Sequence, residues 1–269
     1  MIAHNSKLAE LVSRGLSALK LPMVAIAWMF ASACFTTSQA KPIVPGSSPF
    51  LDDTADKTVM FVSRGASSAF CGGVYVTENA VLTAYHCVDE GQWCTNDMGI
   101  TLTSCGTPDA GNEVRNDATK HAFLFYTYDD HKSGATCTSE PWIAVLVKHD
   151  ERADLALLYT RHASAAYATI AGMLPETGSI AYVIGHPEWV SYTHLSAHVN
   201  SASTRTMRNK KGTFSRHVVV LDKRIREGTS GGGLWNAGGE LIGICLSRST
   251  IFNESYFASV VEIDTFLLQ

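Results

Sequence analysis

Charged residues are scarce in this 269-residue chain, at 17%, whereas apolar residues make up 46%. A chain of this composition can bury a core, which excludes an intrinsically disordered protein. The formal net charge is only −4 and lacks the basic excess of a general nucleic-acid binder. Long apolar runs, sustained heptads and repeats of roughly 20–50 residues are also missing. Their absence excludes a multi-span membrane protein, a coiled coil and a repeat array.

One apolar run does occur near the start of the chain, at residues 21–35. Three basic residues precede it: Lys7, Arg14 and Lys20. The run is as long as a signal-peptide core and shorter than the ~20 residues of a membrane-spanning helix, and small residues follow at Ser38 and Ala40. We therefore expect residues 1–40 to be a signal peptide, and the mature chain to be secreted or periplasmic without stable membrane association. An uncleaved anchor, or lipidation at Cys34, is the alternative.

Removal of residues 1–40 leaves an even number of cysteines. The six are Cys71, Cys87, Cys94, Cys105, Cys137 and Cys245. In an exported chain an even set predicts disulfides rather than thiols. A cysteine-based metal site is not expected, because no Cys-x-x-Cys occurs. We expect neither a metal nor a cofactor.

The apolar stretches after residue 50 are short, and clusters of Gly, Asn, Asp, Ser or Pro separate them. They are 58–62, 73–77, 81–83, 122–128, 143–147, 155–159, 180–184, 218–221, 241–246 and 257–261. Many short strands between turn signals predict an all-β barrel or sandwich, since a βαβ fold would need long amphipathic helices. A helix or a crossover is expected at 163–173, and a terminal helix at 261–268.

An alanine-containing stretch at residues 161–176 divides these strands into two sets of similar size. We interpret it as the linker between two β-barrels. The N-terminal barrel would span residues 41–160 and the C-terminal barrel residues 177–269.

Three separated motifs carry side chains suited to acyl transfer. His86 follows the apolar strand 81–83, Asp154 precedes four apolar residues, and Ser230 lies in a glycine-rich run. A serine hydroxyl becomes a nucleophile when a base takes its proton, and histidine suits this role near neutral pH. A buried carboxylate holds the imidazole in one tautomer. Glycines let backbone N–H groups point at the developing oxyanion.

The order of these motifs along the chain distinguishes between two enzyme classes. The stretch 228–232 also matches Gly-x-Ser-x-Gly, which α/β-hydrolases use. In that class the histidine follows the serine, whereas the last histidine here is His217. The order His, Asp, Ser fits the chymotrypsin arrangement instead. Asp150, in a charged run, is the alternative partner for His86.

With these motifs, and with Cys71-Gly72-Gly73 upstream, the chain resembles the chymotrypsin-like, trypsin-fold serine endopeptidases over nearly all of its mature length. The resemblance implies two antiparallel β-barrels with the active site in the cleft between them. It implies that His86 is the general base, that Asp154 orients it and that Ser230 attacks the substrate. The backbone amides of Gly228 and Ser230 would form the oxyanion hole.

The same resemblance implies a disulfide between Cys71 and Cys87, which would brace the turn that carries His86. Cys94 and Cys105 are expected to form the next pair, which leaves Cys137 with Cys245.

A departure at Thr229 points to the bacterial branch of the family. Thr229 stands where the animal enzymes carry an aspartate that pairs with a new N-terminus after zymogen cleavage. A buried α-ammonium would lack a carboxylate there, so we expect activity without a new N-terminus at Ile43. Thr229, Asp222 and the stretch 184–187 resemble the glutamyl endopeptidases and the protease domains of HtrA proteins.

The family resemblance also assigns a substrate pocket. Its predicted residues are Arg224, Ile225, Glu227, Cys245 and Leu246. Arg224 lies six residues before Ser230, near the position of the selecting charge in trypsin-like enzymes. A cation there would repel Lys and Arg of a substrate and favour acidic or small polar side chains.

A basic stretch precedes the serine motif and is predicted to be a solvated hairpin, with an anionic partner or membrane surface as the alternative. Its residues are Arg205, Arg208, Lys210, Lys211 and Arg216.

The predicted function is that of a secreted serine endopeptidase that hydrolyses protein or peptide substrates through an acyl-enzyme. The alternatives are a weak or inactive binding protein on the same fold, and an esterase that uses the same site.

Overall fold

A computed structural model describes residues 40–62, 69–88, 94–95, 120–133, 141–187, 192–209, 212–249 and 251–269. The predicted signal peptide lies outside the described residues apart from Ala40, as do Cys105 and Cys137. Among the described residues, no helix combines the length and the apolar character needed to cross a membrane.

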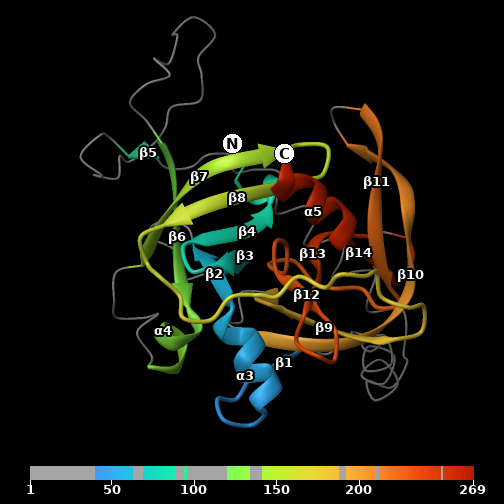
Figure 1. Ribbon diagram of the computed structural model, residues 1–269. Helices are drawn as coiled ribbons and strands as arrows, with labels where there is room; N and C mark the ends of the chain where they lie inside the picture. Colours follow the sequence, from blue (N-terminus) through green and yellow to red (C-terminus); the bar gives the residue numbers. More distant parts are fainter. Residues whose placement is uncertain are drawn as a thin grey trace, which may run out of the picture. The chain divides into compact units, whose positions relative to one another are not determined.

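The first set of strands forms a closed antiparallel barrel (Figure 1). Its strands are β2 (Thr58–Val62), β3 (Ala69–Thr77), β4 (Ala80–Ala84), β6 (Lys120–Thr127), β7 (Trp142–Asp150) and β8 (Leu155–Thr160). They are ordered β2-β3-β4-β8-β7-β6, and pairing of β2 with β6 closes the ring. The short β5 (Cys94–Thr95) pairs with β6 outside the ring.

The second set closes in the same way. Its strands are β9 (Ile180–Gly185), β10 (Thr193–Asn209), β11 (Gly212–Leu221), β12 (Gly233–Trp235), β13 (Leu241–Arg248) and β14 (Ser255–Ser259). They are ordered β10-β11-β14-β13-β12-β9, and pairing of β9 with β10 completes the ring. The all-β prediction with two antiparallel barrels is therefore confirmed.

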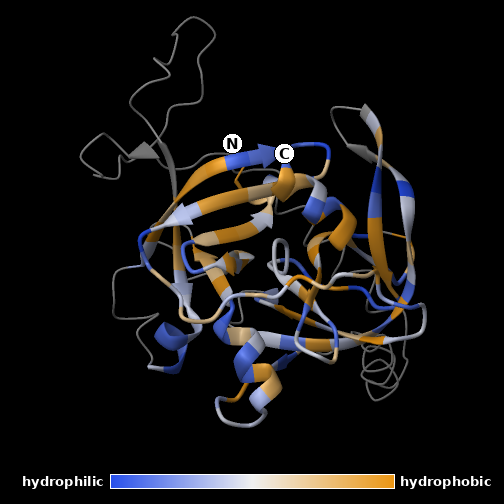
Figure 2. Ribbon diagram, viewed as in Figure 1, coloured by the Kyte–Doolittle hydropathy of each residue, from blue (hydrophilic) through white to orange (hydrophobic). Residues whose placement is uncertain are grey.

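The strands of both barrels are rich in apolar residues (Figure 2), and many of these side chains are buried. In the first barrel the fully buried side chains include Phe61, Leu82 and Leu155. In the second barrel a separate cluster contains Val219 and Phe257. The strands that carry the predicted motifs are therefore held in place by the packed side chains of the barrels.

The N-terminal segment does not stay with the first barrel. β1 (Lys41–Pro42) pairs with β10 of the second barrel, although the predicted domain limits put residue 41 in the first. The helix α3 (Pro49–Asp56) then leads into β2. Ser48 caps it, because its side chain accepts a hydrogen bond from the Leu51 amide, and Pro49 suits the first helical position.

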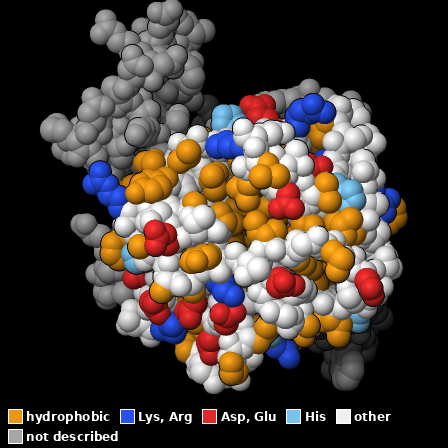
Figure 3. Space-filling view, viewed as in Figure 1, with side chains coloured by type: hydrophobic (Ala, Val, Ile, Leu, Met, Phe, Trp, Pro, Cys, Tyr) orange, Lys and Arg blue, Asp and Glu red, His pale blue; other side chains and the backbone are white. Residues whose placement is uncertain are grey.

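Two further helices end strands earlier than predicted. α4 (Tyr128–Lys132) begins at the last residue of the predicted strand 122–128, where Thr127 and Asp130 form a capping box. α5 (Val260–Leu268) follows β14 directly and confirms the predicted terminal helix. Charged side chains of both signs gather around α3 and α4 (Figure 3) and include an ion pair between Lys132 and Asp56.

Residues 161–179 connect the barrels without regular secondary structure, so the connection is a crossover rather than a helix. The Ala168 amide donates to the Tyr75 carbonyl in the first barrel, at 2.7 Å. The Ala171 amide donates to the Leu241 carbonyl in the second, at 3.0 Å. Because these contacts use the amides that a helix would pair internally, alanine's helix propensity is overridden here.

A buried histidine and a buried tyrosine fasten the second barrel to the first. His186 Nε2 lies 3.2 Å from the Val59 carbonyl, and its Nδ1 accepts a hydrogen bond from the Tyr192 amide at 3.0 Å. The Tyr192 hydroxyl lies 3.1 Å from the carbonyls of Thr58 and Tyr126. Burial lowers the pKa of His186 to about 3, so the ring stays neutral and Nε2 carries the proton that Val59 accepts.

Candidate active site

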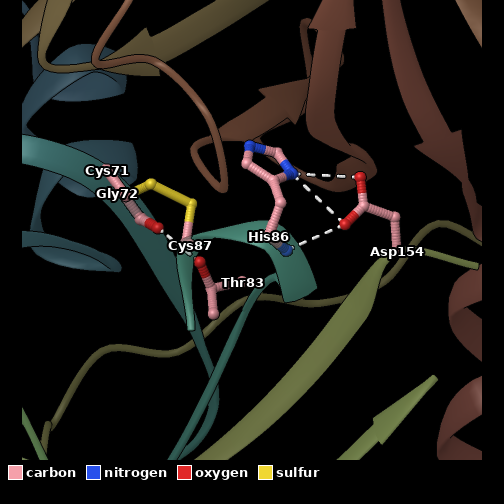
Figure 4. Close-up of a disulfide and its surroundings, with 6 residues drawn as sticks. All are labelled: Cys71, Gly72, Thr83, His86, Cys87 and Asp154. Carbon is pink, nitrogen blue, oxygen red and sulfur yellow. Dashed lines mark hydrogen bonds and ion pairs between the residues drawn. A yellow bond between two sulfur atoms is a disulfide. The ribbon is translucent and has the colours of Figure 1, made fainter. Parts of the chain in front are cut away.

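His86 lies on one turn of 3₁₀-helix, η1 (Tyr85–Cys87), which continues directly from β4. A hydrogen bond from the Val88 amide to the Tyr85 carbonyl closes the turn, at 2.8 Å. The neighbouring Cys87 forms a disulfide with Cys71 of β3, which confirms the predicted pair (Figure 4). The turn is thus tied to two adjacent strands of the first barrel.

Removal of this disulfide is expected to destabilise the barrel. A Cys71→Ala/Cys87→Ala variant should lose about 3 kcal/mol of unfolding free energy, because the crosslink restricts a loop of some 15 residues in the unfolded chain. Urea unfolding of the oxidised proteins measures this. Cys245→Ala removes a cysteine that forms no disulfide and serves as the control. An unchanged unfolding free energy in the double variant would contradict the bracing role.

Asp154 contacts His86 at two points (Figure 4). Its Oδ1 accepts a hydrogen bond from the His86 amide at 2.9 Å, and its Oδ2 lies 3.0 Å from His86 Nδ1. A carboxylate can only accept, so Nδ1 carries the proton and Nε2 has the lone pair. The His86 side chain is exposed, whereas the Asp154 side chain is largely buried. Solvent or a substrate can therefore reach the imidazole ring of His86.

The alternative partner, Asp150, has a different task. Its Oδ1 accepts hydrogen bonds from the amides of Arg152 and Ala153, at 2.7 and 3.1 Å. It therefore caps the turn that precedes β8. Of the two carboxylates, Asp154 is the one that touches His86.

Asp154 adopts a left-handed backbone conformation, with φ of 56°. Few residues other than glycine do so, although aspartate tolerates it better than most. The Asp154 carbonyl accepts a hydrogen bond from the Tyr85 amide at 3.0 Å. Both the backbone and the side chain of Asp154 therefore bind η1. Such local strain persists where the surroundings enforce it, often at functional sites.

The Ser230 loop is held by backbone hydrogen bonds on both sides. The Gly231 amide donates to the Cys245 carbonyl at 2.8 Å, and the Cys245 amide donates to the Gly232 carbonyl at 2.9 Å. From the first barrel, the Gly72 amide donates to the Ser230 carbonyl at 2.7 Å. The loop is therefore positioned by β13 of its own barrel and by β3 of the other.

Gly231 can only be glycine. Its φ is +77°, and a Cβ there would lie 2.2 Å from both the Gly72 carbonyl oxygen and Thr83 Oγ1. It would also lie 3.2 Å from the amide nitrogen of Ala84, two residues before His86. The glycine run thus brings the serine loop into contact with the strand that carries the histidine.

The two predicted oxyanion donors lie in the glycine-rich loop. Gly228 has φ of +89°, which directs the following turn, and it is buried together with Thr229. In the described part of the chain, neither the Gly228 nor the Ser230 amide donates a hydrogen bond to a protein acceptor. Both remain available for a ligand oxygen.

The five predicted pocket residues are divided between three places. Arg224 and Ile225 line a hollow with residues of β9 and β10, among them Val183 and Leu195. Glu227 instead forms an exposed ion pair with Arg248, at 2.6 Å. Cys245 and Leu246 are buried in β13 and do not line this hollow.

Cys245 has a free thiol, which removes it from the disulfide pairings that the sequence left open. The side chain is fully buried among apolar residues such as Val183 and Phe257, and burial raises the pKa of its thiol. It behaves as a small apolar residue, and its backbone provides the hydrogen bonds that hold the glycine run.

The described residues contain one metal-like grouping, of Cys71, His86 and Cys87. Its two sulfur atoms are joined to each other in the disulfide and are therefore not thiolate ligands. This grouping does not fit a metal site.

The chain passes through Ile43 as an ordinary peptide. The Ile43 amide donates to the Tyr192 carbonyl at 2.8 Å, and its side chain is buried. Thr229 is also buried and packs against Gly185. Activity without a new N-terminus at Ile43 stays a prediction.

Sequence reasoning missed Arg216, which was predicted to be part of a solvated hairpin. Arg216 is buried, and its Nη1 lies 3.7 Å from Asp154 Oδ2. The alternation of β11 contains the signal, because Arg216 shares its strand face with Val218 and Val220, both fully buried.

The double barrel, with the His86–Asp154 pair on the first barrel and Ser230 in the glycine-rich loop of the second, defines the class of the serine endopeptidases. The sequence model of the trypsin-like peptidase domain matches residues 71–244, and the chain belongs to this family. No curated protein matches it in sequence.

Bacterial proteases of this fold are similar in structure at low sequence identity. The active form of the Rv3671c protease from M. tuberculosis is 17% identical, with a TM-score of 0.60 over 87% of this chain and 90% of that chain. A serine endoprotease from Yersinia pestis is 18% identical, with a TM-score of 0.54 over 84% and 67%. An HtrA-type protease with a tripeptide is 19% identical, with a TM-score of 0.55 over 81% and 61%.

Proposed function

We propose that this chain cleaves peptide bonds through an acyl-enzyme on Ser230. His86 takes the proton of the serine hydroxyl, and Asp154 holds the ring and stabilises the imidazolium that forms. The amides of Gly228 and Ser230 bind the oxyanion of the tetrahedral intermediate. The observation that carries the proposal is the contact of Asp154 with His86 Nδ1, which leaves Nε2 as the base.

The proposal predicts that wild-type protein reacts with a fluorophosphonate probe and cleaves members of a peptide library. The probe forms a covalent bond only with an activated serine, and mass spectrometry should locate it on Ser230. A binding protein on the same fold would give neither result. An esterase would react with the probe and turn over simple esters, but would leave the peptides intact.

The same library tests the proposed specificity. Arg224 is exposed at the edge of the hollow that it lines, and its guanidinium should disfavour substrates with Lys or Arg at the cleaved bond. We expect cleavage after acidic or small polar residues. Efficient cleavage after Lys or Arg that is unchanged in Arg224→Ala would refute the role of this arginine.

We further propose that the mature chain works outside the cytoplasm, as a secreted or periplasmic enzyme. The apolar segment before Ala40 supports an export signal. The Cys71–Cys87 disulfide also supports it, because such bonds persist in oxidising compartments.

A further inference from the structure

Arg216 reaches from the second barrel to the turn that carries Asp154. It lies on β11, and its side chain is only 8% exposed. Its Nη1 donates a hydrogen bond to the Ala153 carbonyl at 3.0 Å and lies 3.7 Å from Asp154 Oδ2. The guanidinium thus approaches the Asp154 carboxylate, whose oxygens also bind His86.

Burial of a guanidinium is costly unless a counter-charge is close. Burial lowers the pKa of Arg216, and Asp154 is the main group that opposes this effect. Arginine nevertheless stays protonated in proteins. A further contact of its charged group is with the face of the Phe214 ring, 4.8 Å from Arg216 Cζ. Within the described residues, Nε has no hydrogen-bond partner. The Asp154 carboxylate is therefore the counter-charge that this arginine meets directly.

The other ionisable groups around this pair have contacts of their own, although Glu262 and Asp150 also attract the Arg216 guanidinium, after Asp154. Glu262 of α5 accepts a hydrogen bond from the His217 amide, and His217 Nδ1 contacts Ser259. Asp150 accepts the turn amides, and Glu151 accepts a hydrogen bond from the Tyr85 hydroxyl. His149 stacks on the Tyr85 ring. None of these hydrogen bonds or ring contacts involves the Asp154 carboxylate.

We propose that Arg216 is a positioning residue for the His86–Asp154 pair. Its guanidinium, which comes from the second barrel, holds the Asp154 carboxylate in place and partly neutralises its negative charge. Less of that charge then stabilises the imidazolium that forms on His86 during the reaction. This inference rests on the proposed function.

The test compares the pH dependence of kcat/KM in three variants. Arg216→Met removes the charge at similar length, Arg216→Gln keeps an amide donor without charge, and Arg216→Lys keeps the charge. When the positive charge of Arg216 is removed, the Asp154 carboxylate stabilises the His86 imidazolium more strongly. The acid limb of the kcat/KM profile should therefore move to higher pH. We expect a shift of about half a unit to one unit for Met and Gln, and an unmoved limb for Lys. If Arg216→Met does not fold, the Gln variant decides.

Arg205 offers a matched control. It pairs with Arg216 in the β10–β11 register, but its side chain is exposed. Arg205→Met should leave the profile unchanged.

The proposal is overturned if folded Met or Gln variants keep the wild-type acid limb, or if Lys shifts it as far as they do. Either result with an active wild-type enzyme refutes only the role of Arg216. A wild-type protein that neither reacts with the fluorophosphonate nor cleaves peptides refutes the proposed function itself.

Discussion

Ser230→Ala is expected to reduce peptide turnover by about 10⁴-fold or more, and His86→Ala by a similar factor. The serine variant has no oxygen to form the acyl-enzyme, and the histidine variant has no base to activate that oxygen. Neither side chain supports the barrels, so unfolding in urea should match the wild type. Steady-state kinetics on a peptide substrate measures the loss.

The second barrel provides a matched control for the histidine. His198 faces Asp222 much as His86 faces Asp154: its amide donates to Asp222 Oδ1 at 2.9 Å, and its Nδ1 lies 3.3 Å from Oδ2. This pair is exposed. His198→Ala should therefore keep wild-type turnover. More than a few per cent of wild-type turnover in Ser230→Ala or His86→Ala would refute the assignment of the pair and the nucleophile.

Gly231→Ala should abolish labelling of Ser230 and destabilise the protein by about 3 kcal/mol or more, since a positive φ and a severe clash act together. The added Cβ would lie 2.2 Å from Gly72 O and from Thr83 Oγ1. These two atoms belong to the hydrogen bond between Thr83 and Gly72, at 2.7 Å. To relieve the clash, the serine loop must move away from β3 and β4. Urea unfolding and the rate of fluorophosphonate labelling measure both effects.

Two other glycines separate the contributions. Gly178 has φ of +85° with open space around it, so Gly178→Ala isolates the backbone strain, worth about 1 kcal/mol. Gly172 has neither a positive φ nor a near neighbour, so Gly172→Ala should be close to neutral. A Gly231→Ala variant no less stable than Gly178→Ala would show that the loop adapts without loss of the contact.

The sequence alone predicted the architecture, because period-two alternation and turn residues are local properties. The strands 58–62, 155–159 and 180–184 agree with β2, β8 and β9 to within one residue. The order of the histidine, aspartate and serine motifs then pointed to the family to which the chain belongs. The Cys71–Cys87 pair followed from that resemblance and is present.

Local patterns failed where distant contacts decide. The 17-residue β10 is rich in Ser, Thr and Asn, and it becomes a strand because it pairs with both β9 and β11. Residues 163–173 were compatible with a helix, but their amides bond to both barrels instead.

The sequence by itself determined the all-β class, the family and the residues suited to acyl transfer. Only the tertiary structure decided that Asp154 rather than Asp150 contacts His86, that Cys245 remains a thiol, and that Arg216 is buried against Asp154. Each of these depends on which groups meet across strands or barrels far apart in the chain. A buried charge such as that of Arg216 is tolerated only when a counter-charge lies close to it. The packing of the two barrels is what brings Asp154 close to Arg216.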